Sequence, residues 1–316
     1  MWFKQVTLFQ LPDSFRRKTQ ELAQKLEPLA FSPCLPSLPS SQGWVSPVHE
    51  ENAPLVQTIN GYTMLCLQIE EKILPMSYVN QELLKKLKEI ETQQGRKVRQ
   101  KEKFAMKDEL VATLLPRAFT KLTRVYGYLD PENNGLVLGT NNQKRLDQFR
   151  TYFTRSLNEE THPLNIKKLG PTLTLWLKTQ NYSSNFALEK ACLLQDPNQE
   201  NRLIRCQHQD LLAPSLQGFI KDGCQVKQLA LSWQDRIQFV LADDFSLSGL
   251  KYQEELISEA KDLEAETLQQ KFIADFLIMS GTLSALLKDL RAALRLEQEE
   301  TGVEGQGKIV PMAKVG

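Results

Sequence analysis

Positive charge is concentrated in one stretch of this chain, between Lys85 and Lys107. The stretch holds nine Lys or Arg residues and three Glu residues, a net charge of +6, whereas the whole 316-residue chain carries +1. Such a concentration attracts polyanions whatever the overall charge. The alternative is an ordinary solvated helix face. As phosphate contacts we select the bases in and just after this stretch: Arg96, Lys97, Arg99, Lys101, Lys103, Arg117 and Lys121.

Motifs for enzyme chemistry are scarce. The chain contains no GxxxxGK[ST], GxGxxG, HExxH or GxSxG pattern. Its three histidines, His49, His162 and His208, stand in polar contexts, which favours surface residues over ligands. Asp243 and Asp244 could bind a metal, but no third ligand follows at a useful spacing, so a turn after a strand is the stronger interpretation. We predict no catalytic residue, no metal and no cofactor.

Aromatic residues offer a second route to nucleic acid, because any base can stack on a ring. Trp44, Trp176 and Trp233 are candidates, although Trp233 lies in an alternating apolar pattern typical of a core strand. Phe119 stands among basic residues at the end of the charged region. Both an exposed ring and a core position remain open for it.

Composition is that of an ordinary globular protein, with 41% hydrophobic and 24% charged residues. The length allows two or three domains. No run of 18 apolar residues exists, so we expect no membrane helix, and the first residues are typical of a strand rather than a signal peptide. Five cysteines without a CxxC pattern indicate reduced thiols in a cytoplasmic protein.

Periodicity predicts an α+β fold with antiparallel sheets and an inserted helical arm. We expect strands at residues 3–11, 62–69, 123–129, 136–140, 185–194, 202–207, 224–233 and 236–242. We expect helices at residues 13–29, 76–94, about 100–115, 142–157, 171–180, 211–221 and 268–296. Asp13 is the expected N-cap of the first helix, and Gly95 should break the arm into two helices.

This order divides the chain into parts. We expect a central α+β domain at 1–74 and 125–170, a basic helical tip at 75–124, a base domain at 171–300 ending in a long helix, and a disordered tail at 301–316. Residues 254–300 hold eleven acids and five bases, so the charge of the base opposes that of the tip. The last helix has an apolar stripe wide enough to face its own domain and a partner: Leu283, Leu286, Leu287 and Leu290.

Six segments of the sequence resemble a known family, the recombination-associated protein RdgC. They are GWVSP (43–47), EEKILP (70–75), KDE (107–109), LLPRAF (114–119), LALSWQDRIQFVLADD (229–244) and ADFLIMSG (274–281). They extend over residues 1–296 in order, so the resemblance covers nearly the whole chain.

The resemblance implies a bacterial protein that is not an enzyme and is cytoplasmic or nucleoid-associated. Such proteins form ring-shaped homodimers, closed by contacts at tip and base, that encircle double-stranded DNA with little sequence preference and restrain the RecA recombinase by occupying DNA. His208 and Gln209 stand where the family can carry a Lys-Gln pair facing DNA. Because a histidine is mostly neutral at pH 7, that contact should be weaker here.

Elementary physics is consistent with such a ring. A closed dimer needs self-complementary contacts across its two-fold axis. The stripe of the last helix could supply one contact, and the arm around Phe119 the other. A basic inner wall would meet phosphates without reading bases. The competing hypothesis is an interaction protein whose basic arm binds an acidic protein partner.

Overall fold

The computed structural model describes residues 2–13, 15, 18–48, 50, 53–164, 169–261 and 267–294. His49 and the tail at 301–316, which we expected to be disordered, lie outside these residues. Within the described ranges, no helix is long and apolar enough to cross a membrane.

The chain combines helices with antiparallel strands, as expected for an α+β fold. The strands are β1 (Gln5–Gln10), β2 (Ser40–Val45), β3 (Val56–Ile59), β4 (Tyr62–Ile73), β5 (Phe119–Asp130), β6 (Gly135–Leu138), β7 (His162–Pro163), β8 (Phe186–Asp196), β9 (Gln199–Gln207), β10 (Gln225–Trp233), β11 (Ile237–Ala242) and β12 (Leu247–Tyr252). The α-helices are α1 (Thr19–Leu26), α2 (Met76–Gln94), α3 (Gln100–Leu114), α4 (Gln143–Leu157), α5 (Leu169–Thr179), α6 (Pro214–Lys221), α7 (Glu254–Lys261) and α8 (Leu268–Ala293), with short 3₁₀ turns at Glu27–Leu29 and Leu115–Arg117.

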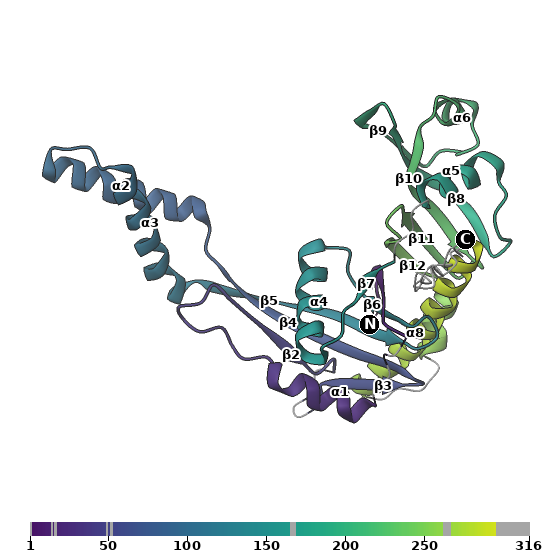
Figure 1. Cartoon of the computed structure of the whole chain (residues 1–316), viewed down its shortest axis with the longest axis horizontal. Coiled ribbons are helices and arrows are strands. Elements are labelled where there is room, and N and C mark those ends of the chain that lie inside the picture. Colours follow the sequence, from purple (N-terminus) through teal and green to yellow (C-terminus); the bar gives the residue numbers. More distant parts are fainter. Residues whose placement is uncertain are drawn as a thin grey trace, which may run out of the picture.

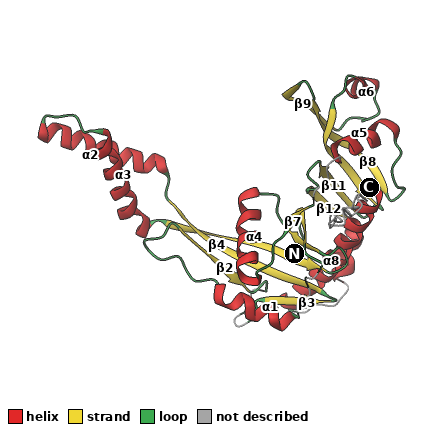
Figure 2. Ribbon diagram, viewed as in Figure 1, coloured by secondary structure: helices red, strands yellow, loops and turns green. Residues whose placement is uncertain are grey.

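The molecule has the shape of an open C (Figure 1). Helices α2 and α3 form an arm at one end, the strands around β4 and β5 form the middle, and the strands from β8 to β12 form the other end. Figure 2 shows that strands connect all parts except the arm, which is helical.

One twelve-stranded antiparallel sheet runs through the body. Ten strands follow the order β2-β4-β5-β6-β1-β12-β11-β10-β8-β9, while β3 pairs with β4 and β7 with β1. Strand β1 is shared: its first residues, Gln5 and Val6, pair with β12, and Thr7 to Gln10 pair with β6. The division into central and base domains at residue 170 therefore stays a proposal, because hydrogen-bonded strands continue across it.

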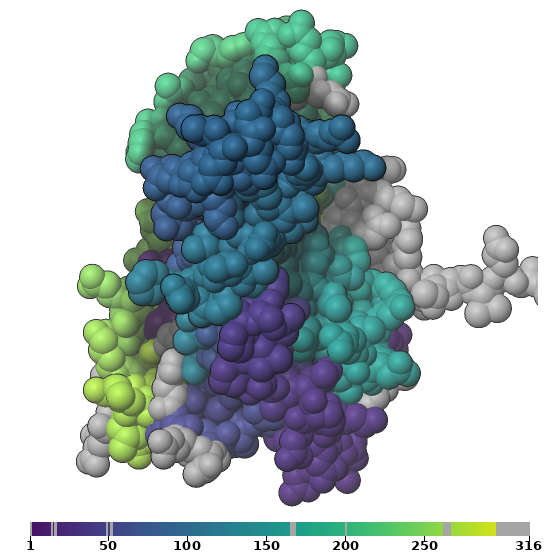
Figure 3. Space-filling view, turned by 90° about the vertical axis from the view of Figure 1, so that its left-hand side faces the viewer, coloured from purple at the N-terminus to yellow at the C-terminus, as the bar shows by residue number. Residues whose placement is uncertain are grey.

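Alternate side chains of the central strands enter two different cores. Leu65, Leu67 and Ile69 pack with α1 and α4, whereas Met64 and Tyr128 belong to a larger core shared with α5 and α8. Seen from the arm side, α1 and α4 lie on one side of the sheet and α8 on the other (Figure 3). The period-two alternation of a strand explains this separation.

Several elements differ from the sequence-based expectation. The first helix begins at Thr19, and its N-cap is Lys18 rather than Asp13. The Asp13 carboxylate instead accepts a hydrogen bond from Asn134 Nδ2 at 2.9 Å, so it is used by a neighbouring turn. Strands β3, β7 and β12 and helix α7 were not foreseen, since each is short and weakly patterned.

Helix α8 requires a correction. Leu283, Leu286, Leu287 and Leu290 were expected to divide their surface between their own domain and a partner. In the structure all four are 0% exposed, packed into the core that joins both halves of the sheet. Side chains wholly covered within one chain leave no surface for a second copy. These four leucines are therefore core residues and not interface residues.

A buried carboxylate fastens α8 to the central hairpin. Asp130, at the end of β5, is 1% exposed and accepts hydrogen bonds from the backbone N–H groups of Glu132 and Asn133, from Asn133 Nδ2 at 2.8 Å and from Ser284 Oγ at 3.0 Å. Asn133 Nδ2 also donates to the Ser284 carbonyl, and Arg291 Nη1 donates to the Asn133 carbonyl. A buried charge is tolerated when hydrogen bonds satisfy it in this way.

We expect Asp130→Asn to lower the free energy of unfolding by about 1–3 kcal/mol, because the amide leaves buried donors without an acceptor. Urea unfolding measures the change, with exposed Glu132→Gln as the matched control. A double-mutant cycle with Ser284→Ala should give a coupling of about 0.5–3 kcal/mol. Additive effects would mean that the carboxylate does not attach the helix.

Candidate nucleic-acid interface

The arm is built as the sequence predicted. Helix α2 ends at Gln94, and Gly95 follows in the left-handed conformation, with φ of 63° and its N–H bonded to the Glu91 carbonyl. Glycine adopts this conformation without steric cost, so the chain reverses direction into α3. Val98, buried in the turn, donates its N–H to Glu91 Oε1.

One of the selected basic residues, Arg96, already forms an ion pair within the arm. The guanidinium of Arg96 makes two hydrogen bonds to Glu102, Nη1 to Oε2 at 2.9 Å and Nη2 to Oε1 at 3.0 Å. Glu102 also accepts the backbone N–H of Arg99. The Arg96 guanidinium, helped by that N–H, lowers the pKa of Glu102 to about 2. Arg96 therefore orders the start of α3, and its charge is largely neutralised.

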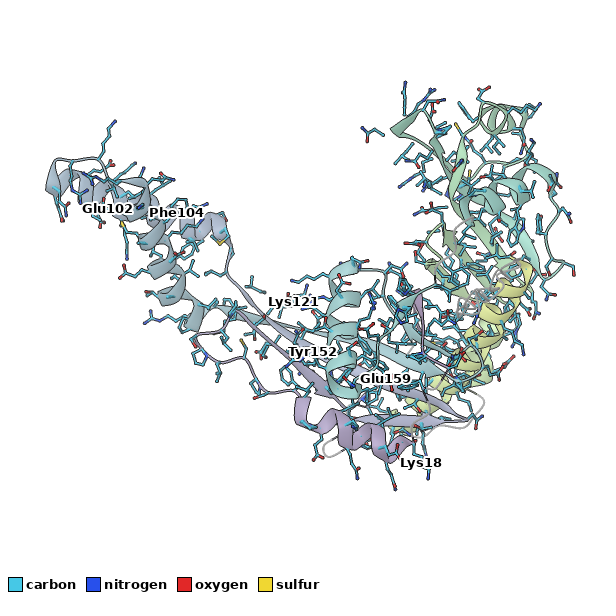
Figure 4. All side chains as sticks on the ribbon, in the orientation of Figure 1. Lys18, Glu102, Phe104, Lys121, Tyr152 and Glu159 are labelled. Atoms are coloured by element: carbon cyan, nitrogen blue, oxygen red, sulfur yellow. The ribbon has the colours of Figure 1, made fainter. Side chains whose placement is uncertain are left out.

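The other bases of the arm remain available. Lys97, Arg99, Lys101, Arg117 and Lys121 are exposed, and Lys103 is half-buried. Among the residues that the structure describes, no carboxylate forms an ion pair with any of these six side chains. Free cations on one projecting element are available to a polyanion. Figure 4 marks the arm with Glu102 and Phe104, and Lys121 on the ribbon that joins the arm to the body.

Phe119 is exposed rather than buried. It begins β5, pairs with Ile73 at the end of β4, and keeps 85% of its surface accessible. Ile73 and Leu122 beside it in the ribbon are also exposed. Phe104 on α3, which sequence reasoning did not single out, is 60% exposed. Because apolar side chains alternate with cations here, only the structure could show which of them lie outside a core.

His208 and Gln209 do not lie with the arm. They follow β9, an edge strand at the far end of the C, which borders its open side (Figure 1). Both are exposed, and His208 has a φ of 54°, which turns the chain at this point. The candidate contacts thus form two groups, separated by the concave space of the molecule.

The remaining candidates have structural partners. Trp44, Trp176 and Trp233 are buried, with indole N–H bonds from Trp44 to Ser156 Oγ and from Trp233 to Asp289 Oδ2. They are therefore not available to stack on bases.

The paired aspartates behave as turn residues. Asp243 forms an ion pair with Lys227 at 2.8 Å, and Asp244 accepts the N–H of Ser246. His162 is exposed on β7. In the described part of the chain, no three His, Cys, Asp or Glu residues gather as metal ligands.

Comparison with known proteins identifies the family of this chain. Residues 1–297 match the family model described as "Putative exonuclease, RdgC". The chain is 34% identical over 296 residues to the recombination-associated protein RdgC of Yersinia enterocolitica, covering 93% of this chain and 98% of the relative, and the protein of the same name from Yersinia pestis matches equally. This chain belongs to the RdgC family.

The two descriptions within the RdgC family differ. The family model names an exonuclease, whereas the relatives are named for recombination. No enzymatic activity follows from either name.

Two RdgC-like motifs meet at the foot of the arm. Residues 70–75 and 114–119 are brought together because β4 and β5 pair out to Ile73 and Phe119. Lys72 Nζ donates to the Leu115 carbonyl at 3.0 Å, which fastens the last turn of the arm to β4. The arm is thus held by both motifs.

An ion-pair cluster beside this foot was not foreseeable from the sequence. Glu71 accepts Arg145 Nη2 at 2.6 Å and Lys144 Nζ at 2.7 Å, which ties α4 to β4. These hydrogen bonds lower the pKa of Glu71 from its usual value of 4.5. Because Glu71 and its partners are more than 70 residues apart in sequence, no local pattern indicates the contact.

We expect Glu71→Gln to lower the free energy of unfolding at pH 7 by about 1 kcal/mol or less, as for a partly exposed ion pair. Since the pKa is depressed in the folded state, this contribution is present above pH 4.5 and is lost as pH falls below it. Urea unfolding between pH 3 and 7 measures the difference from wild type, with exposed Glu160→Gln as control. A difference that grows on acidification would contradict this assignment.

Proposed function

We propose that this protein is a non-sequence-specific double-stranded DNA-binding protein that encircles DNA as a ring-shaped homodimer. By occupying DNA it restrains RecA-dependent recombination. In this proposal the protein is cytoplasmic and associated with the nucleoid. The observation that carries the proposal is a projecting arm on which six of the selected cations form no ion pair with any carboxylate that the structure describes. Membership in a family of recombination-associated proteins supports the same conclusion.

The chemistry of the arm favours phosphate over base edges. Its selected residues are Lys and Arg on solvent-exposed turns and helix surfaces, which neutralise backbone charge without geometric selection of a base. Two exposed phenylalanines accompany these cations, Phe104 on α3 and Phe119 at the foot of the arm, and a ring stacks on any base without selecting its sequence. Affinity should therefore depend on salt and be similar for different sequences.

Changing Lys97→Glu and Lys101→Glu together should weaken binding to every duplex by the same factor and reduce the slope of log K against log salt by about 2. Fluorescence anisotropy with three unrelated duplexes measures both quantities. The matched control is Lys18→Glu with Lys25→Glu on the outer helix α1, an equal charge change far from the arm (Figure 4).

Equal effects of the two double variants would indicate general electrostatics and would remove the arm from the DNA surface. Loss of binding to one duplex only would indicate base reading. If neither variant changes DNA binding while the arm binds an acidic protein, the competing hypothesis of a protein-binding arm is correct.

Ring closure is the second part of the proposal. A C-shaped protomer closes into a ring when two copies meet at both ends across a two-fold axis. At the arm we assign the contact to Phe119, since burying a fully exposed phenyl ring contributes about 1.5–3 kcal/mol. A contact at the other end must use residues that remain accessible on α8, such as Leu277 and Ala285, rather than its buried leucines.

The change Phe119→Ser should leave the fold intact and speed release from closed circular DNA, which has no end to slide from. Dissociation rates on closed and linearised forms of one plasmid measure this, with Phe104→Ser as control because it is also an exposed phenylalanine on the arm. Unchanged release from circles would disprove the latch. DNA bending lost with Phe119→Ser would favour insertion between bases instead.

The family description also names an exonuclease, and the same preparations test it. End-labelled linear duplex incubated with the protein and Mg²⁺ or Mn²⁺ should keep its length under the binding proposal. Progressive shortening that a second, independently prepared sample reproduces would replace binding by hydrolysis as the function.

A further inference from the structure

Two of the five cysteines are direct neighbours across a pair of strands. Cys192 on β8 and Cys206 on β9 are register partners, and both are buried, 5% and 8% exposed. Burial, together with the neighbouring Cys206, raises the pKa of the Cys192 thiol. All five cysteines lie in the described ranges and are free.

The spacing of the pair suits a disulfide. Partner residues of antiparallel strands have Cα atoms about 4.5–5.5 Å apart, and a disulfide spans Cα separations of about 4.4–6.8 Å. The register of β8 and β9 therefore places the two cysteines within the range of Cα separations that a disulfide spans. Of the other cysteines in strands, Cys66 faces Val45 and Tyr126, so it has no cysteine as a partner.

A small, open pocket borders both cysteines. Its volume is about 150 Å³, and its lining includes Cys192, Cys206 and the neighbouring Arg205, Gln228 and Val240. A pocket of this size has room for a small oxidant such as hydrogen peroxide beside the two cysteines.

We propose that Cys192 and Cys206 are a dithiol modification site that hydrogen peroxide converts into an intramolecular disulfide between β8 and β9. One thiol gives up its proton, and its thiolate attacks one oxygen of the peroxide and breaks the O–O bond. The products are a sulfenic acid and one water, formed from the leaving hydroxide and the released proton. The second sulfur then displaces the hydroxyl group as a second water. Two thiols and one peroxide give one disulfide and two waters, so two electrons pass from sulfur to oxygen.

The disulfide has a local structural consequence. Strand β9 is the last strand of the sheet and pairs only with β8 along the sheet path. The turn at His208 follows Cys206 by two residues. Linking the two strands prevents β9 from separating from β8. Amide hydrogens of β9 exchange during such local opening, so their exchange rate should fall about tenfold.

The test uses the full chain with Cys34→Ser, which removes the half-buried cysteine that could link two molecules. After peroxide titration, non-reducing peptide mapping should show a 192–206 linkage, a mass lower by two hydrogen atoms, and reversal by dithiothreitol. Hydrogen exchange in β9 should slow only in the linked protein.

Variants make the assignment specific. Adding Cys206→Ser should abolish the linkage, and adding Cys224→Ser, another buried cysteine, should leave it unchanged. The proposal fails if no 192–206 linkage forms at peroxide levels that fully oxidise Cys34 in wild type. It also fails if the linkage appears only in urea. Because every readout is a mass or an exchange rate, the result is independent of whether the protein binds DNA.

Discussion

The curvature of this protein depends on the attachment of one helix to both halves of its sheet. Near its middle, α8 bonds to the central hairpin through Ser284 and the buried Asp130. One turn and a half later, Asp289 accepts Trp233 Nε1 and Asn185 Nδ2 from the strands of the other end. A single rigid helix thus sets the angle between two groups of strands, and with it the width of the concave side.

The arm contrasts with this braced body. Its buried apolar residues are few, chiefly Val79, Leu87, Val98 and Leu110. Little buried surface means low local stability, so the arm relies on the Gly95 turn, the Arg96–Glu102 pair and the ribbon at its foot. In such an element Phe104 and the charged turns remain accessible to a partner molecule. A stiff body with a weakly stabilised, cationic extension suits binding that must form and release.

Features governed by local chemistry could be predicted from the sequence. The break between α2 and α3 at Gly95 occurs as expected, because it depends on one residue that adopts the left-handed conformation without cost. The helix expected at 142–157 occurs as α4, with Asn142 as its N-cap. Contacts across the fold could not. Burial of Leu286 depends on strands from both halves of the sheet that share a core with α8.

The candidate site shows the same division. Lys97 and Lys101 could be selected because a run of cations is visible in any sequence, and their exposure agrees with that selection. The leucines of α8 were assigned to an interface because an apolar stripe indicates burial but not what covers it. The Glu71–Arg145 contact carries no sequence signal, since it joins a strand that precedes the arm in the sequence to a helix that follows it.

The shared strand β1 has a consequence for how the chain is made. Gln5 is synthesised long before its partner Ser248, which lies more than 240 residues later in the chain. On the ribosome β1 can pair with β6 once residue 138 has emerged and, at Phe9 and Gln10, with β7 once residue 163 has emerged. The part of its edge at Gln5 and Val6 stays open until β12 follows. Such an edge is a template for wrong pairing. Nascent chains should therefore need protection of that edge while the second half is synthesised. Folding should be complete only after α8 has packed against both halves of the sheet.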